Sequence, residues 1–193
     1  MTAQKNSIQT GQIIYYVASS LDGYISGKND DISQFILQGE GVEKYQSDIA
    51  KLGTVLMGRK TYEFGYQYGL EPGQPAYPNM ENYIFSDSLK VDTLSDKVHI
   101  EKMNIQRIRE IKNCSTSDIY LCGGGQFAGW LLENGLIDQL KIKLNPIILG
   151  EGTRLFGNST AKAYWNLLEK ESFNDGLEIL TYEAKANPSA LSL

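Results

Sequence analysis

The sequence predicts a single α/β domain with a mixed, mostly parallel central sheet, an antiparallel C-terminal edge and flanking helices. Three observations support this fold class. Short apolar runs alternate with segments of helical periodicity along most of the chain. The last two apolar runs are instead joined by a tight turn, and no linker, repeat or low-complexity segment divides the chain. The domain is expected to cover residues 12–184, with flexible termini at 1–11 and 185–193.

Composition restricts the classes of function. The chain has 193 residues and a formal net charge of −5 without a basic stripe, so nucleic acid is not an expected partner. One histidine and two cysteines provide no tetrahedral zinc set without added carboxylates, and we predict no metal site. No signal-peptide core is visible, and no apolar run approaches the roughly 18 residues that span a bilayer. These features predict a cytoplasmic protein that binds neither nucleic acid nor membrane.

The first predicted strand, residues 13–17, leads into a loop of small residues at 18–27. The loop contains Asp-Gly, a turn signal, and either leaves room for a planar ligand or forms a plain hairpin-like turn. In the polar segment that follows, Asp30 and Asp31 are interpreted as part of a solvated loop that caps the next helix. An acid/base pair or metal ligands are the alternative. Helical spacing then predicts a helix over 42–52.

The second strand, 54–57, runs into a glycine and a basic helix start. Gly58-Arg59-Lys60-Thr61 precedes a short aromatic-rich helix predicted over 62–68. The helix dipole disfavours cations at an N-terminus, so Arg59 and Lys60 are better explained by a phosphate between them than as solvated side chains.

The middle of the chain predicts a proline-rich surface loop, two strands and a short helix. These are expected at 70–80, 83–86, 98–100 and 105–111. His99 alternates with apolar neighbours and is interpreted as structural, without an evident partner. Arg107 and Arg109 are interpreted as solvated.

The strongest functional signal is a buried strand at 119–122 followed by Gly123-Gly124-Gly125 and a helix that begins near Gln126. Bare glycine backbone before a helix N-terminus favours an anion, most often a phosphate, and a tight turn that needs only small residues is the alternative. The turn formally matches a Rossmann fingerprint. Its late position and the lack of a terminal acid on the next strand argue against that fold.

The C-terminal part predicts one long strand over 140–149, bent at Pro146, and two closing strands at 167–173 and 177–182. Asn174-Asp175-Gly176 between the closing strands is a hairpin signal. The long strand offers an apolar surface for a homodimer.

Four motifs in the same order resemble the dihydrofolate reductase superfamily: residues 17–25, 57–62, 122–126 and 146–152. The closer resemblance is to the branch that contains the reductase domain of bifunctional riboflavin-biosynthesis proteins. It implies a dihydrofolate reductase-like fold, a homodimer and an NADPH-dependent reductase. Such an enzyme would transfer hydride to a small pterin-, pyrimidinone- or flavin-like heterocycle, as 5-amino-6-(5-phosphoribosylamino)uracil reductase or dihydrofolate reductase does.

The resemblance also implies where NADPH binds. It assigns Arg59 and Lys60 to the adenosine 2′-phosphate, and Thr61 with the glycine turn to the pyrophosphate. Phe85 and Ser86 are assigned to the adenine side, and the loop after the first strand to the nicotinamide. The full set is Val17, Ala18, Asp22, Gly23, Ile25, Gly58, Arg59, Lys60, Thr61, Phe85, Ser86, Gly123, Gly124, Gly125, Gln126 and Phe127.

The substrate half departs from the family pattern. No carboxylate that would support a pterin can be placed among residues 33–38, and residues 65–69 lack the Asp-x-Pro element of the riboflavin reductases. Tyr24, Tyr62 and Tyr66 are expected to supply stacking surface near the mouth. Catalytic residues therefore remain unassigned. The alternative function is a non-catalytic nucleotide-binding or interaction protein that retains only the cofactor cradle.

Overall fold

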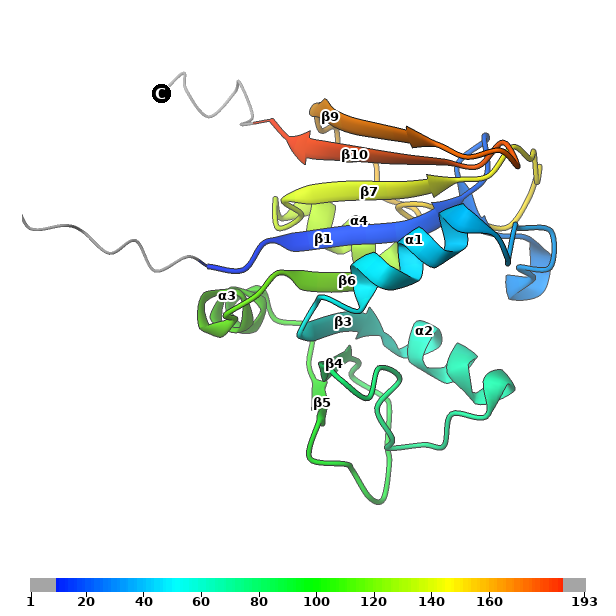
Figure 1. Ribbon diagram of the computed structural model, residues 1–193. Helices are drawn as coiled ribbons and strands as arrows, with labels where there is room; N and C mark the ends of the chain where they lie inside the picture. Colours follow the sequence, from blue (N-terminus) through cyan, green and yellow to red (C-terminus); the bar gives the residue numbers. More distant parts are fainter. Residues whose placement is uncertain (1–9, 186–193) are drawn as a thin grey trace, which may run out of the picture.

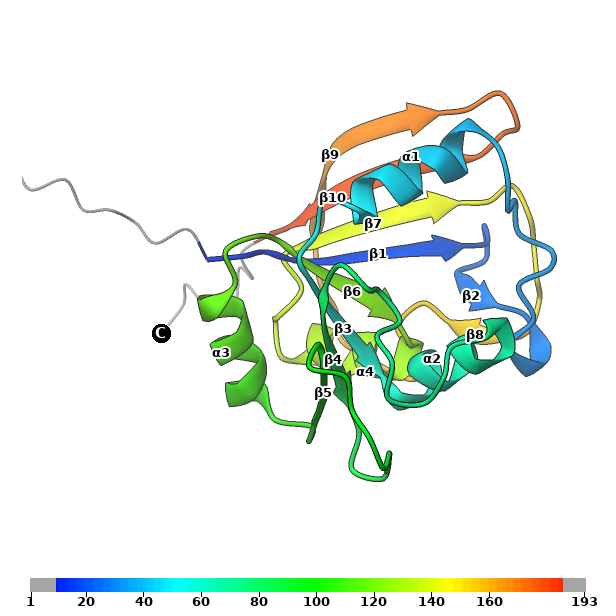
Figure 2. The ribbon, with the colours of Figure 1, turned by 60° about the horizontal axis from the view of Figure 1, so that its bottom comes forward.

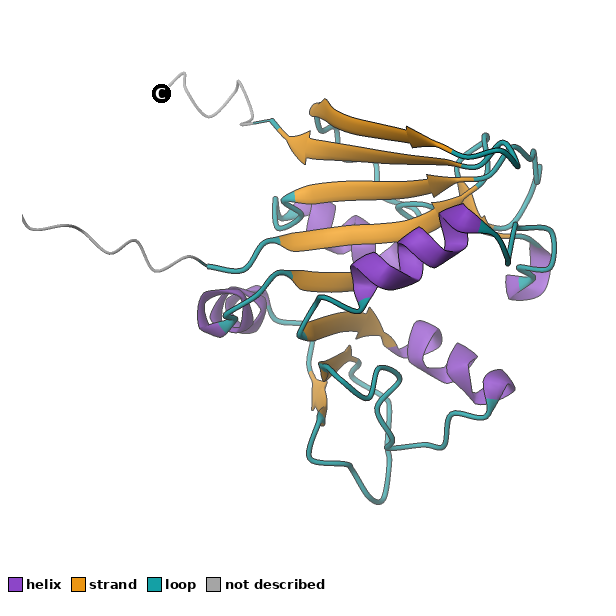
Figure 3. Ribbon diagram, viewed as in Figure 1, coloured by secondary structure: helices purple, strands orange, loops and turns teal. Residues whose placement is uncertain are grey.

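In the computed structural model, which describes residues 10–185, the chain forms one eight-stranded sheet with helices on both faces (Figures 1 and 3). The strand order is β5-β4-β3-β6-β1-β7-β10-β9. The first six strands in this order are parallel, and β10 runs antiparallel to both β7 and β9. This arrangement confirms the predicted α/β class, with its mostly parallel sheet and antiparallel edge. Of the flexible termini predicted at 1–11 and 185–193, residues 1–9 and 186–193 lie outside the described residues.

The element bounds follow the predicted order with small shifts. The strands of the large sheet are β1 (Ile13–Ser19), β3 (Thr54–Gly58), β4 (Glu81–Phe85), β5 (Val98–Glu101), β6 (Ile119–Gly123), β7 (Gln139–Leu144), β9 (Trp165–Ser172) and β10 (Glu178–Ala184). The helices are α1 (Glu40–Ile49), α2 (Arg59–Phe64), α3 (Ile105–Cys114) and α4 (Gly125–Glu133), with 3-10 turns η1 (Lys28–Asp30) and η2 (Gly65–Tyr68). The antiparallel pair β2 (Tyr24–Ser26) and β8 (Thr153–Arg154) was not predicted, because such short strands show no alternation.

An apolar layer packs against each face of the sheet, so the central strands are buried on both faces. On β1, Tyr15 packs with α3 and α4, whereas the next residue, Tyr16, packs with α1 and α2 on the opposite face. Figure 2 shows α1 lying along the strands of one face. No helix within residues 10–185 is long and apolar enough to cross a membrane.

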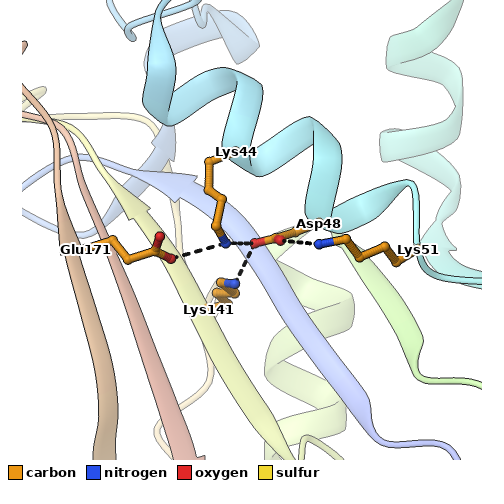
Figure 4. Close-up of polar contacts among 5 residues, drawn as sticks. All are labelled: Lys44, Asp48, Lys51, Lys141 and Glu171. Carbon is orange, nitrogen blue, oxygen red and sulfur yellow. Dashed lines mark hydrogen bonds and ion pairs between the residues drawn. The ribbon is translucent and has the colours of Figure 1, made fainter.

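An ion-pair network fastens α1 to the sheet (Figure 4). Asp48 Oδ2 lies 2.6 Å from the Nζ atoms of both Lys141 on β7 and Lys44 on α1, and Asp48 Oδ1 lies 3.3 Å from Lys51 Nζ. Lys44 also reaches Glu171 on β9 at 3.2 Å. Burial alone would raise the pKa of Asp48, but the hydrogen bonds from Lys141 and Lys44 outweigh it and lower that pKa to about 2.

The predicted long strand over 140–149 is wrong beyond Leu144. The side chain of the buried Asn145 donates to the carbonyl oxygen of Lys143 at 3.0 Å and accepts from the Ile36 amide at 2.9 Å, which turns the chain out of the sheet. Pro146 then lacks the N–H that a ladder needs. Because β7 lies between β1 and β10, both of its edges are paired within the sheet, so a second copy could not extend the sheet there. The expected homodimer stays a prediction.

Three side-chain interpretations and one helix end change in the structure. Arg107 is not simply solvated, because its guanidinium lies 2.7 Å from Glu101 and over the Tyr83 ring. His99 has a structural partner that sequence did not reveal, Glu81, with Nε2 to Oε2 at 2.9 Å. Asp30 and Asp31 do not cap α1, which begins only at Glu40 after Gly39, but lie in and directly after η1. The helix predicted over 42–52 ends at Ile49.

We predict that Asp48→Asn destabilises the protein at pH 7 by about 1.5–3 kcal/mol, because three lysines lose their shared anion. The folded-state pKa lies below the ordinary value of 3.8, so this stabilisation is present above about pH 4 and is lost as pH falls toward 2. Urea unfolding from pH 2.5 to 7 measures it. The difference between wild type and variant should shrink with acidity. Asp92→Asn, which removes an exposed carboxylate, is the control. A pH-independent difference would contradict the assignment.

Candidate functional site

The two predicted glycine junctions meet at one edge of the sheet. Strands β3 and β6 are parallel neighbours, and each ends in glycine before a helix, α2 and α4 respectively. A Cβ placed on Gly124 would lie 2.7 Å from Thr61 Oγ1, and one on Gly58 would lie 3.4 Å from Phe127 Cβ. Two helix starts therefore adjoin at the carboxyl ends of the strands, where ligands bind in open α/β sheets.

A cavity of about 1060 Å³ opens at this edge. It is as large as the roughly 300–1,000 Å³ of typical small-molecule sites. All of the residues that the resemblance implies, except Asp22 and Gly23, line this one cavity. The rest of the lining comes from segment 26–37, helices α1 and α2 with η2, strands β3, β6, β7 and β8, the loop 69–77 and the turn after β5. These residues are Ser26, Asp30, Ile32, Phe35, Leu37, Tyr45, Met57, Phe64, Gly65, Tyr68, Gly69, Leu70, Ala76, Tyr77, Met103, Tyr120, Cys122, Lys143 and Thr153.

Asp22 fastens two loops together. Its carboxylate accepts hydrogen bonds from Ser20 Oγ at 2.6 Å and from the backbone N–H groups of Leu149 and Gly150 at 3.1 and 2.7 Å. These bonds, that of Ser20 foremost, lower the pKa of Asp22 to about 2. Asp22 and the adjacent Gly23 therefore shape the rim of the first loop, while Val17, Ala18 and Ile25 reach the cavity.

The three glycines of the turn are required for different reasons. Gly123 and Gly124 adopt φ values of 133° and 85°, which L side chains avoid. A Cβ on Gly125 would overlap the backbone carbonyl oxygen of Arg154, so tight packing alone accounts for that glycine. No side chain caps α4, whose first N–H groups follow directly on this turn at the cavity wall. This geometry suits an anion at the turn.

The cations of the second junction are differently engaged. Arg59 forms an ion pair with Glu63 one helical turn later, with Nη1 to Oε2 at 2.7 Å, and its side chain is 40% exposed. Lys60 is exposed and also lines the cavity. The i,i+4 spacing of Arg59 and Glu63 on a helix is the sequence signal for this pair.

The cavity lining also holds polar groups that sequence reasoning did not find; together with the apolar residues beside them they are called the substrate end. Tyr45 on α1 and Tyr120 on β6 share a hydrogen bond between hydroxyl oxygens at 2.7 Å, and Tyr77 lies 3.2 Å from Cys122 Sγ. Burial raises the pKa of all three tyrosines and of the thiol, so these groups are neutral donors and acceptors. The fifth polar side chain is Lys143. The sequence signal for those on β6 and β7 was the alternation of side chains along each strand, which does not show which side of the strand faces a cavity.

The tyrosines that we expected at the mouth lie elsewhere. The described residues that line the cavity include Tyr45, Tyr68, Tyr77 and Tyr120 but none of Tyr24, Tyr62 and Tyr66. Apolar walls come from α2, the 70–77 loop and the segment before α1, where Phe35 is buried and Leu37 is 56% exposed. Neutral hydroxyls between apolar walls suit a planar, polar ring.

The comparison with protein families decides the family. The model of the RibD C-terminal domain matches residues 12–180. The chain belongs to this family. Membership confirms the predicted superfamily and supports a reductase-type function.

Similar proteins cover nearly the whole chain. The uncharacterized protein YyaP of Bacillus subtilis (strain 168) is 24% identical over 92% of this chain and 97% of its own. A Shewanella sp. PV-4 protein attributed to riboflavin biosynthesis has a similar structure, with a TM-score of 0.75, 24% identity and coverage of 91% and 99% of the two chains. Dihydrofolate reductase from Enterococcus faecalis, complexed with NADP(H), has a similar structure with a TM-score of 0.62 and 15% identity. The match covers 92% of this chain and 98% of the reductase chain. At these identities the structural matches establish the fold.

One cavity wall depends on a buried hydroxyl. Tyr62, fully buried on α2, accepts a hydrogen bond from the Gly73 N–H at 2.8 Å and donates one to the Gln74 carbonyl oxygen at 2.8 Å. The predicted surface loop at 70–80 is thus anchored, and its residues Leu70, Ala76 and Tyr77 reach the cavity.

We predict that Tyr62→Phe lowers the free energy of unfolding by about 1–3 kcal/mol, because the Gly73 N–H is left buried and unpaired. The 70–80 loop should also become cleavable in limited proteolysis under native conditions. Denaturant unfolding and mass spectrometry of the fragments measure both effects. Tyr68→Phe changes an exposed tyrosine and serves as the control. An equally protected loop in Tyr62→Phe would contradict the anchoring role.

Proposed function

We propose that this protein is an NADPH-dependent reductase that transfers hydride to a C=N or C=C bond of a small planar heterocycle. The observation that carries the proposal is the meeting of the β3–α2 and β6–α4 junctions on one wall of a cavity large enough for a dinucleotide and an acceptor. Pterin-, pyrimidinone- and flavin-like rings are the proposed acceptors. The activity would be like that of 5-amino-6-(5-phosphoribosylamino)uracil reductase or dihydrofolate reductase, in the cytoplasm.

The residues of the cofactor end fit the phosphates of NADPH. A side chain at Gly124 would fill the space beside Thr61 Oγ1, which the glycine leaves open. The turn at 123–127 and Thr61 would hold the pyrophosphate, and Arg59 with Lys60 the 2′-phosphate. Phe85 and Ser86 would line the adenine side, and Val17, Ala18 and Ile25 the nicotinamide. Asp22 and Gly23, which lie outside the lining, would act only by shaping the loop.

When bound, NADPH supplies a hydride from its nicotinamide ring. The chain's own contribution is to hold the acceptor ring against the cofactor end. Phe35, Leu37 and Leu70 would exclude water from one side of the ring. The hydroxyls of Tyr45 and Tyr120 are protonated donors that would orient its carbonyl or ring nitrogen atoms.

The alternative is a non-catalytic protein that retains the cofactor cradle. The scarcity of acidic side chains in the cavity favours this alternative. Among the described residues, Asp30 is the one acid in the lining, and its carboxylate already accepts a hydrogen bond from Thr153 Oγ1 at 3.2 Å. A turnover screen with NADPH and a panel of pterins, pyrimidinones and flavins separates the two functions. NADPH binding without oxidation in any reaction would favour the alternative.

A homodimer remains a proposal, now placed at another surface. Strand β9 is one of the two edge strands of the sheet, with β5 at the other edge, and it exposes Leu167 and Leu168, each 54%. Thr181 of β10 pairs with Glu169 and Tyr182 pairs with Leu167, so Leu168 has no partner and forms a β-bulge in β9. Light scattering at micromolar concentration would show a monomer if this proposal is wrong.

We predict that NADPH binds more tightly than NADH and that Arg59→Ala reduces this preference by about 1.5–3 kcal/mol, because the 2′-phosphate loses a charge-assisted partner. Glu63→Gln should increase the preference, since it removes the carboxylate that now pairs with Arg59. Titrations of both cofactors measure these effects. Arg109→Ala, at an exposed position, controls for net charge. Equal affinities of the unmodified protein for NADPH and NADH would remove this assignment.

We predict that Gly124→Val abolishes NADPH binding while it lowers the free energy of unfolding by only about 1–3 kcal/mol, because the side chain meets the Thr61 hydroxyl and a strained φ. Gly125→Ala is the contrasting variant. Its methyl group meets the Arg154 backbone, so it should chiefly lower the melting temperature. Both quantities are measured on one preparation. A folded Gly124→Val protein with unchanged NADPH affinity would overturn the phosphate cradle.

A further inference from the structure

The substrate end of the cavity contains a buried cation without a carboxylate partner. Lys143 on β7 is only 5% exposed and yet lines the cavity. Its Nζ donates one hydrogen bond, to the Ile36 carbonyl oxygen at 3.2 Å, and lies 5.2 Å from the centre of the Tyr45 ring. Two of its three N–H groups therefore have no acceptor among residues 10–185.

Lys141, two residues earlier on the same face of β7, shows how this fold neutralises a lysine. Its Nζ lies 2.6 Å from Asp48 Oδ2 beneath α1. Lys143 lies closer to the carboxyl end of the strand, in register with Ala18 on β1, which itself lines the cavity. The two lysines thus differ in what faces them, a carboxylate in one case and the cavity in the other.

An unpaired buried ammonium is costly unless an anion meets it. Burial lowers the pKa of Lys143, and the more distant Asp175 only partly counteracts this effect. Asp175 is itself engaged with the Leu177 N–H at 3.0 Å. A bound anion would accept the open N–H groups and stabilise the charged form of Lys143.

We propose that Lys143 forms an anion-binding subsite and that the acceptor is a planar heterocycle that carries a carboxylate. One ammonium matches the single charge of a carboxylate, and the adjoining Phe35, Leu37 and Tyr45 match the ring. The inference rests on the proposed function, which decides that the acceptor, and not the cofactor, occupies this end.

Calorimetric titrations with two matched pairs of probes test the inference: 6-carboxypterin against pterin, and orotate against uracil. Within each pair the compounds differ by one ring carboxylate. We expect the wild type to bind the carboxylate of at least one pair about tenfold or more tightly than its neutral partner. Lys143→Gln keeps a donor for Ile36 without the charge and should bring this ratio to within about twofold, whereas Lys143→Arg should retain most of it.

Two controls distinguish a local contact at Lys143 from a general effect of protein charge. Lys170→Gln removes a charge from β9, outside the cavity, and should leave the ratio unchanged. NADPH titrated into the same samples reports on the cofactor end independently. NADPH binding without a carboxylate preference in either pair overturns this inference alone, as does a preference that Lys143→Gln retains. A carboxylate preference without NADPH binding supports the subsite and overturns the proposed cofactor.

Discussion

The candidate site depends on the pairing of β3 with β6 as parallel neighbours. Thr54 to Leu56 align with Ile119 to Leu121, and the register shifts so that Met57 meets Gly123. Each strand then passes through glycine into a helix, and parallel strands bring both helix starts to the same edge. Either junction alone would be an ordinary turn. Side by side, they form one wall on which bare backbone, a hydroxyl and two cations face a shared cavity.

The opposite wall depends on how α1 is held. Apolar packing alone would be expected to position a short helix with one apolar face, but here Asp48 of α1 also forms an ion pair with Lys141 of the sheet. This contact fixes the helix against β7 and so places Tyr45 beside Tyr120 and over Lys143. The electrostatic contact lies away from the cavity. Its consequence is nevertheless the arrangement of the cavity's hydroxyl groups.

The cavity therefore has two chemically different ends. The cofactor end presents glycine backbone and exposed cations, which suit phosphates. The substrate end presents aromatic rings, neutral hydroxyls, a thiol and one buried ammonium, which suit a planar ring with polar substituents. This division matches the sequence, in which the cofactor motifs resemble the family whereas residues 33–38 and 65–69 depart from it. The departing segments supply apolar wall residues such as Phe35 and Leu37.

The sequence by itself determined the fold class, the order of the main elements and both glycine junctions, because these depend on local periodicity and on backbone freedom. It could not determine the strand order, the end of β7 at the buried Asn145 or the partner of His99, because each depends on contacts between residues distant in the chain. The pair of Arg107 with Glu101 spans only six positions, but it joins a helix to the preceding strand, and their relative placement is decided by the tertiary structure. Nor could it show that Lys141 meets a carboxylate while Lys143 meets a cavity. Both lysines occupy the same alternating pattern. Only the packing of α1 and the first loop against the sheet decides which charge is neutralised and which remains open to a ligand.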